Sequence, residues 1–343
     1  MASTSYLKIF LAITLGFGAL HAGSLIAFLY SPLSFYHRAT EYIRDIAYQV
    51  EDAPMRWEGM EYPDLSRDYY FLYRYPERVT VTTDSDGFRS TRYEAENYPV
   101  AVAGDSTIFG THLNDSDTLP WRLSEAIETP VFNAAQTNMS NILAHPKLGD
   151  IQVFIDVLTE RSVFPRILEK RETSIRKMDF QPLARKSLNV LEAVGEIPPQ
   201  RYSLPLIIFN NMGKMAGDFK AWRKGGEQPR LYMRHHMLSS ELNETVAIIA
   251  ARKRAFDPLG IRYVFVPIPA KQNLYADDVD DYTRNFLPVL FERLRAEGIE
   301  YVDLDTPFRA HKNEELFYAY DTHWNKKGTA LAAKVIAEQL FGQ

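Results

Sequence analysis

Three residue types that together can perform acyl transfer stand at two separate places in this 343-residue chain. Ser106 lies in the tripeptide Gly104-Asp105-Ser106, directly after an apolar run, and Asp321 and His323 lie near the C-terminus. A serine hydroxyl is a weak nucleophile until a base removes its proton, and the imidazole of that base needs a carboxylate to fix its tautomer. The set therefore predicts a nucleophile, a base and an orienting acid in one site.

The spacing of Asp321 and His323 suits that chemistry. Two residues separated by one position in an extended loop point the same way, so Asp321 can hold one ring nitrogen of His323 while the other faces Ser106. Each of the two stretches also has a structural alternative. The one with Ser106 can be a turn that caps a helix, and the one with Asp321 and His323 can be a polar cap with Trp324 as its anchor. Catalysis is favoured because both halves are expected at the same edge of one sheet.

Strand and helix patterns alternate along the chain around these residues. Short apolar runs predict strands at 99–103, 131–132, 151–158, 262–267 and 301–304, the third of them alternating between apolar and polar positions, and β-branched residues predict a further strand at 79–83. Amphipathic patterns predict helices at 119–127, 238–257, 282–297 and 327–340. This alternation of strands and helices predicts an α/β fold with a doubly wound, mostly parallel sheet. Ser106 then stands at the carboxyl edge, where such sheets bind ligands.

The composition narrows the classes of function. Hydrophobic residues make up 46% and charged residues 24%, which is ordinary for a folded globular protein. The net charge of −5 gives no support to a nucleic-acid partner. The absence of cysteine excludes disulfides, thiolate metal sites and a cysteine nucleophile. We expect no cofactor and no metal.

The N-terminus carries a long apolar segment. Residues 9–30 contain no Asp, Glu, Lys or Arg, and about twenty apolar residues at roughly 1.5 Å each span the core of a bilayer. A cleaved signal peptide is the alternative, although Leu20 stands where a cleavage site near Ala22 needs a small residue. A retained single-pass anchor is favoured. The large remainder has no second apolar span, so we expect it on the periplasmic or extracellular side of a bacterial inner membrane.

The chain divides by composition into three parts. Residues 1–31 are the expected membrane anchor, residues 32–96 a stalk with an N-terminal appendage, and residues 97–343 the catalytic domain. A basic, irregular stretch at about 165–236 interrupts the catalytic domain and is interpreted as a helical insertion. It is either a solvated surface or a surface that meets anionic lipid headgroups or an anionic polysaccharide.

Several short motifs carry a family resemblance. They are Asp86-Gly87-Phe88-Arg89, Gly104-Asp105-Ser106, Val131-Phe132-Asn133, Glu160-Arg161, Pro267-Ile268-Pro269-Ala270-Lys271, Asp303-Leu304 and Asp321-Thr322-His323-Trp324-Asn325. In this order they resemble the SGNH (GDSL-type) hydrolase superfamily, and more narrowly its branch of alginate O-acetyltransferase-like, membrane-anchored bacterial proteins. The resemblance covers about residues 79–164 and 240–343.

The resemblance implies roles for the three residues named first. Ser106 would carry the acyl group, His323 would act as base, and Asp321 would orient it. Family esterases usually place the acid three residues before the histidine, where this chain has Tyr320, so the closer Asp321 must serve. The resemblance also implies a polysaccharide acceptor and a multi-span membrane O-acyltransferase that delivers the acyl group.

The blocks that usually supply oxyanion donors depart from the family pattern. Family esterases have a glycine in the second block and an asparagine in the third, whereas residues 133–138 here contain no glycine and the third block offers Arg161. The backbone N–H of Ser106, the side chain of Asn138 and that of Arg161 are the candidate donors. Lys271 either lines the substrate cleft or caps a strand end, and Trp324 either stacks on a sugar ring or packs in the core.

Three functions follow from these residues. The first is an exported, membrane-anchored O-acyltransferase, most simply an O-acetyltransferase, that modifies hydroxyls of a cell-surface polysaccharide through an acyl-serine. The second is a carbohydrate or lipid esterase with the same Ser-His-Asp triad. The third is an inactive SGNH-like scaffold of an export complex, which the altered oxyanion blocks suggest.

Overall fold

The structure is a computed structural model that describes residues 2–30, 40, 54–67, 76–135, 142–165, 168, 212 and 235–343. The chain forms two compact units: residues 1–52, 59–78 and 184–229, and residues 53–58, 79–183 and 230–343. Most of the expected insertion at 165–236, and the oxyanion candidate Asn138, lie outside the described residues.

The first unit begins with one long apolar helix, α1 (Ala2–Tyr30). Its segment Tyr6–Ala27 has a mean hydropathy of 1.9, which by length and composition is enough to cross a membrane. The Thr14 and Ser24 hydroxyls donate to backbone carbonyls one turn earlier, at 2.9 and 2.6 Å, so these polar groups are satisfied within the helix. A signal sequence has the same properties, so the helix fits either of the two predicted roles.

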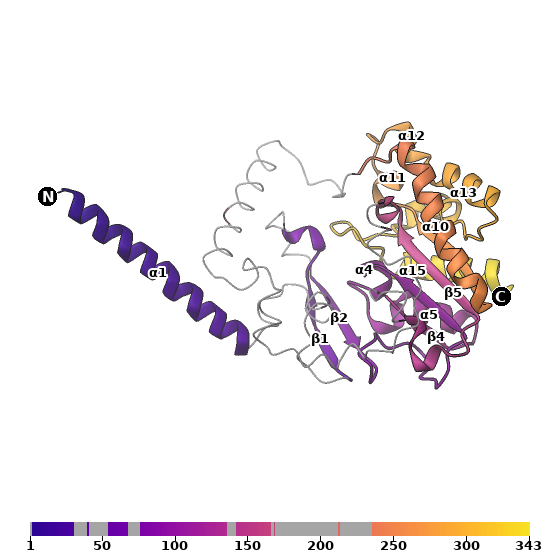
Figure 1. The fold of residues 1–343 in the computed structure, drawn as a ribbon, viewed down its shortest axis with the longest axis horizontal. Coiled ribbons are helices and arrows are strands. Elements are labelled where there is room, and N and C mark those ends of the chain that lie inside the picture. The colour runs from indigo at the N-terminus through magenta and orange to yellow at the C-terminus, as the bar shows by residue number, and fades with distance from the viewer. Residues whose placement is uncertain are drawn as a thin grey trace. The chain divides into compact units, whose positions relative to one another are not determined.

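The second unit is built on a parallel sheet of four strands (Figure 1). The strands are β3 (Val100–Gly104), β4 (Val131–Asn133), β5 (Val153–Thr159) and β6 (Arg262–Ile268), in the order β4-β3-β5-β6. All three pairings are parallel. The predicted α/β class is therefore confirmed. Separately, β1 (Arg56–Glu61) and β2 (Glu77–Thr82) form a two-stranded sheet, and β2 covers most of the strand predicted at 79–83.

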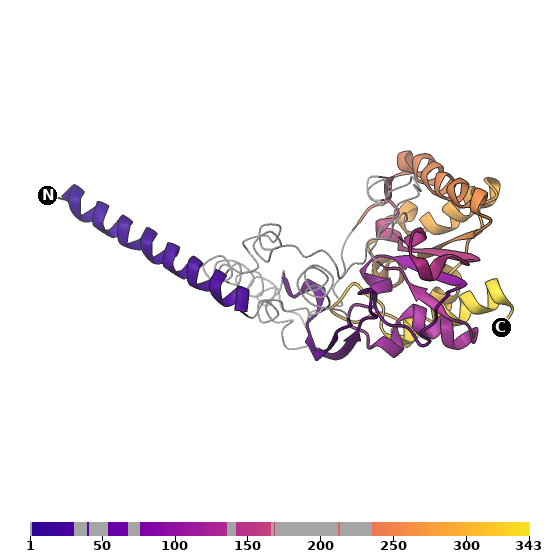
Figure 2. The same cartoon turned by 60° about the horizontal axis from the view of Figure 1, so that its bottom comes forward.

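Helices cover both faces of the parallel sheet (Figure 2). Phe154 and Phe265 belong to a buried cluster with residues of α10 (Leu242–Phe256) and α13 (Phe286–Ala296). The alternate strand positions are also buried, on the side where α5 (Leu119–Ala126) packs against β4 and against α15 (Lys326–Phe341). Because helices cover both faces of the sheet, the sequences of the central strands are nearly continuous apolar runs.

Short helices complete the second unit. They are α4 (Ser106–Phe109), α11 (Lys271–Tyr275), α12 (Asp281–Arg284) and α14 (Asp305–Ala310). The helix predicted at 282–297 is split into α12 and α13 at Asn285, because Pro288 has no N–H to continue the hydrogen-bond ladder across the junction.

Two strand predictions need correction. All seven residues of β5 are buried, so its polar position Asp156 does not face solvent. The Asp156 carboxylate accepts from Arg252 Nη1 at 2.7 Å and from the Tyr263 hydroxyl at 2.9 Å.

The strand predicted at 301–304 is only a single parallel bridge between Tyr301 and Phe265. The chain turns into α14 there, because the Asp303 carboxylate accepts from a backbone N–H at the start of that helix.

The strand order places Ser106 at a point where the chain reverses direction across the sheet. β3 lies between β4 and β5, so the chain leaves β3 toward one side and later crosses to the other. Crevices at the carboxyl ends of such strands are the usual ligand sites of open α/β sheets. Ser106 is the second residue after β3 and the first residue of α4.

Gly104 is required by the close approach of α4 to the sheet. A Cβ atom at this position would lie 2.1 Å from Ile108 Cγ1 and 2.8 Å from the Val157 carbonyl oxygen. We expect Gly104→Ala to lower the free energy of unfolding by about 3 kcal/mol, at the upper end of overpacking costs, because a backbone carbonyl cannot move aside. The measurement is urea unfolding. Gly149→Ala is the matched control, since its nearest atom would be 3.6 Å away, and equal midpoints for the two variants would contradict the expectation.

Candidate active site

Asp105 fixes the turn that presents Ser106. Its Oδ1 accepts from the Thr107 N–H at 2.9 Å and so caps α4. Its Oδ2 accepts from the Thr159 hydroxyl at 3.0 Å and from the Ser162 hydroxyl at 3.3 Å. The turn after β3 is thereby tied to the end of β5, and Asp105 acts as a structural residue.

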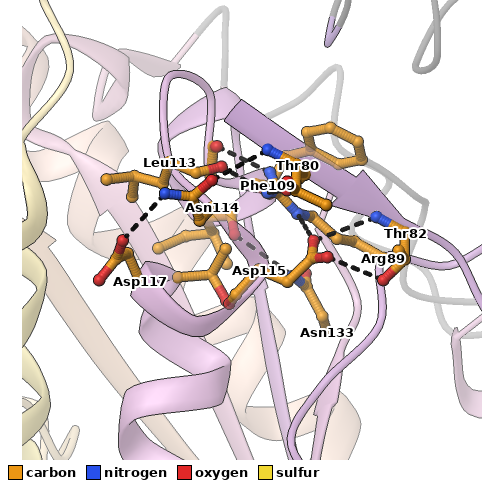
Figure 3. Close-up of polar contacts among 12 residues, drawn as sticks. Thr80, Thr82, Arg89, Phe109, Leu113, Asn114, Asp115, Asp117 and Asn133 are labelled. Carbon is orange, nitrogen blue, oxygen red and sulfur yellow. Dashed lines mark hydrogen bonds and ion pairs between the residues drawn. The ribbon is translucent and has the colours of Figure 1, made fainter. Parts of the chain in front are cut away.

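A buried arginine holds the other end of α4 (Figure 3). Arg89 is only 2% exposed, and its Nη1 donates to the carbonyls of Phe109 and Gly110 at 2.8 and 2.7 Å. Its Nη2 donates to the Leu113 carbonyl at 2.6 Å, and its Nε pairs with Asp115 Oδ1 at 3.0 Å. One guanidinium therefore satisfies carbonyls that the short helix leaves open at its C-terminal end.

Asp115 connects the contacts of Arg89, which together we call the clamp, to strand β2. Its carboxylate accepts from the Thr82 N–H at 3.2 Å and from the Thr82 hydroxyl at 2.8 Å, as well as from Arg89. Arg89 belongs to a motif that the sequence singled out without assigning it a role. The structure gives it one: it fixes α4, and with it Ser106, against β2.

The structure brings together the three residues predicted to form the site. Ser106 Oγ lies 2.8 Å from His323 Nε2, and His323 Nδ1 lies 2.5 Å from Asp321 Oδ1. Asp321 is fully buried and His323 is nearly so, while Ser106 is partly exposed. This is the arrangement in which an imidazole can take a proton from a serine hydroxyl that a substrate can reach.

The loop that carries Asp321 and His323 is closed on itself. Phe317 and Trp324 form an antiparallel bridge, and the Tyr318 N–H donates to the His323 carbonyl at 3.3 Å. The His323 N–H donates to Asp321 Oδ1 at 2.8 Å, so backbone and side chain fix the same carboxylate oxygen. The two residues thus hold their relative positions through local bonds.

Trp324 does not have the substrate-stacking role considered for it. Its side chain is fully buried, and its ring centroid lies 6.4 Å from that of Phe308. A sugar ring has no access to it. Trp324 lies in the core beside Phe308, as the packing alternative expects, in the loop before α15 begins.

Lys271 lines a small pocket beside the candidate site and also makes contacts that neither sequence alternative described. The residue is 5% exposed, and its Nζ donates to the backbone carbonyls of Ala319 at 2.7 Å and Asp321 at 3.0 Å. The ammonium therefore binds the loop that carries the predicted orienting acid. Lys271 begins α11, so this contact joins the end of β6 to that loop.

A small pocket opens at the ends of β5 and β6. It is lined by Thr159, Arg161, His235, Pro269, Ala270, Lys271, Gln272, Phe317 and Thr322. Arg161 is partly exposed there, directly after β5, so it stays a candidate substrate or oxyanion contact. Thr322 lies between Asp321 and His323 in the chain, so the pocket adjoins the loop of the candidate site.

Glu160 is a buried acid at this edge of the sheet, and the sequence assigned it no role. It is 1% exposed, and its carboxylate accepts from the Ala270 N–H at 2.9 Å and from Asn273 Nδ2 at 2.8 Å. These bonds fix the turn from which Lys271 extends. Burial raises the pKa of the Glu160 carboxyl from its ordinary value of 4.5 to about 8, although both N–H donors oppose that shift.

The raised pKa of Glu160 makes a testable contribution to stability. Between about pH 4.5 and 8 the folded protein retains a proton that the unfolded chain has lost, so the free energy of unfolding falls as the pH rises. Glu160→Gln removes this dependence. We expect the stability of the variant relative to the wild type to increase across that window, by on the order of a few kcal/mol.

The quantity to measure is the change with pH in the free energy of unfolding of Glu160→Gln relative to the wild type, by urea unfolding at several pH values. A glutamine at position 160 must turn its amide NH₂ toward one of the two donors, Ala270 N or Asn273 Nδ2, and that cost is the same at every pH. Glu292→Gln, at an exposed position of α13, is the control. A constant difference between Glu160→Gln and the wild type would contradict the expected shift.

Comparison with known proteins confirms the resemblance predicted from the sequence. Residues 226–343 match the family described as "SGNH hydrolase-like domain, acetyltransferase AlgX". A 140-residue segment is 30% identical to the "Probable alginate O-acetylase AlgJ" of Pseudomonas syringae pv. tomato. This match covers 36% of the present chain. The match spans 35% of that relative, about a third of its length.

Two solved structures are similar to the chain at low identity. One is described as "a putative SGNH hydrolase from Slackia heliotrinireducens", with 12% identity, a TM-score of 0.34, and coverage of 71% of this chain and 98% of that one. The other is a "putative lipolytic protein of G-D-S-L family from Desulfitobacterium hafniense DCB-2", with 14% identity, a TM-score of 0.34, and coverage of 69% and 99%.

Proposed function

We propose that the chain is an O-acetyltransferase that modifies hydroxyl groups of a polysaccharide through an acetyl-serine. The observation that carries this proposal is the 2.8 Å distance between Ser106 Oγ and His323 Nε2, in a chain whose residues 226–343 match an acetyltransferase family. The match of residues 226–343 to that family supports an enzyme, and the buried carboxylate of Asp321 supports His323 as its base.

The proposed reaction has two half-reactions at one serine. His323 Nε2 takes the proton of Ser106 as Oγ attacks the acetyl carbonyl of the donor, and it returns that proton to the leaving group. An acceptor hydroxyl then gives its proton to His323 and attacks the acetyl-serine, and Ser106 Oγ recovers a proton as the ester bond breaks. Transfer requires the acceptor to outcompete water at the acetyl-serine.

The partners and the location follow from the same proposal. The relative's name, an alginate O-acetylase, supports a polysaccharide acceptor, and a multi-span membrane O-acyltransferase is the proposed source of the acetyl group. Helix α1 would hold the protein to the bacterial inner membrane, with the sheet and its site on the periplasmic side. Residues 1–31, 32–96 and 97–343 are the proposed anchor, appendage and catalytic domain.

The test is the fate of an acetyl group offered as an activated ester, with and without candidate oligosaccharides. The proposal expects acetylated oligosaccharide, formed at the expense of free acetate, and loss of both products in Ser106→Ala. Acetate release that no oligosaccharide diverts would instead indicate an esterase. A wild-type protein that gives neither product while Ser106→Ala retains full biological function would indicate a scaffold.

A further inference from the structure

A second histidine contacts the carboxylate of Asp321. His112 Nε2 lies 3.3 Å from Asp321 Oδ2, and both side chains are about 1% exposed. The other carboxylate oxygen, Oδ1, accepts from both the ring and the backbone N–H of His323. Two imidazoles thus share one buried acid, each at its own oxygen.

The backbone at His112 has an unusual conformation. His112 has φ 67°, in the left-handed region that residues other than glycine rarely adopt. Such a conformation persists only where the surroundings enforce it. They do so here, because the Tyr318 hydroxyl donates to the His112 carbonyl at 2.8 Å, and Arg89 binds the carbonyls of Gly110 and Leu113 on either side.

The shared carboxylate requires opposite tautomers of the two rings when both are neutral. His323 must carry its proton on Nδ1, facing Asp321, so that Nε2 is free to accept from Ser106. His112 places Nε2 3.3 Å from Asp321 Oδ2, so the tautomer with its proton on that nitrogen is the one that can donate to Oδ2. A carboxylate held at both oxygens cannot rotate about its Cβ–Cγ bond without losing a partner.

We propose that His112 is a positioning residue that acts through Asp321 on the base His323. The inference rests on the proposed function for its catalytic consequence, while its physical claim concerns only the geometry of the carboxylate. His112 fixes the plane of that carboxylate and thereby keeps the His323 ring aligned with Ser106.

Two substitutions separate this role from a purely structural one. Glutamine places an amide NH₂ near the position of a histidine Nε2, whereas the shorter asparagine reaches only about as far as Nδ1. Asparagine is the better residue for a positive φ. A backbone role therefore ranks His112→Asn above His112→Gln, and a positioning role ranks them in the opposite order.

The first readout is the downfield proton NMR line of the His323–Asp321 hydrogen bond, in the full chain in detergent at one pH, assigned by its loss in His323→Ala. We expect His112→Gln to keep its position and His112→Asn to shift or broaden it. His311→Asn, at an exposed histidine, serves as the control. An unchanged line in His112→Asn would overturn the proposal.

The second readout is the rate of acetyl-enzyme formation from an activated ester. We expect His112→Asn to be about 10- to 100-fold slower, with KM little changed, and His112→Gln to stay near the wild type. Equal rates, or a faster His112→Asn, would overturn the proposal. If the wild type forms no acetyl-enzyme while the NMR line still responds to His112, the proposed function fails and this inference stands.

Discussion

Replacing Ser106 with alanine is expected to abolish acetyl transfer while leaving the protein folded. The hydroxyl lies 2.8 Å from His323 Nε2 and is the atom that the proposed mechanism acylates. In serine hydrolases, loss of one member of the triad costs about 10⁴- to 10⁶-fold in turnover, and loss of the nucleophile lies at the upper end. We expect a loss in that range, measured as initial rates with an activated acetyl ester and an oligosaccharide acceptor.

Ser90→Ala is the matched control for this substitution. Ser90 is partly exposed and lies outside the candidate site, so its removal should change neither the rate nor the thermal midpoint. His323→Ala should match Ser106→Ala, and the double variant should be no slower than either, because the two residues act as a unit. Additive losses in the double variant would argue against a shared role.

Replacing Arg89 with methionine is expected to have the largest effect on stability. The side chain is almost fully buried and binds three carbonyls of the segment from Phe109 to Leu113 as well as the carboxylate of Asp115. Arg89→Met keeps much of the apolar stem but leaves Asp115 without its cation. We expect the free energy of unfolding to fall by about 3–5 kcal/mol, the cost of breaking a buried ion pair from one side.

Urea unfolding of Arg89→Met and Arg92→Met measures this effect. Arg92 pairs with Glu125 at the surface, so its replacement should leave the midpoint unchanged within error. Because Arg89 also fixes α4, we expect the acetylation rate of any folded Arg89→Met to fall as well. A variant as stable and as active as the wild type would show that the clamp does not position Ser106.

The parts of the fold that were predictable are those that depend on local patterns. Buried strands at 100–104 and 262–268 and the helix at 326–341 are each encoded by consecutive residues with a clear period. Their alternation fixes a parallel sheet, and the sheet then fixes which residues can meet at its edge. The distance between Ser106 and His323 follows from that topology, although 217 positions separate the two residues.

The parts that could not be predicted depend on partners distant in the sequence. Asp156 looks like a solvent-facing position until Arg252 and Tyr263 are found beside it. Lys271 reaches backbone carbonyls some fifty positions away, and no side-chain pattern marks a carbonyl as a partner. His112 carried no signal, because its contact with Asp321 joins positions far apart in the sequence and no local pattern marks it.

The most direct test of the central claim is to locate the acetyl group on the protein. The wild type is treated with an activated acetyl ester, quenched in acid, digested and mapped by mass spectrometry. Acetylation confined to Ser106, lost on addition of an oligosaccharide that becomes acetylated, is the expected result. A protein that acetylates the oligosaccharide while Ser106 stays unmodified and Ser106→Ala stays active would contradict the account.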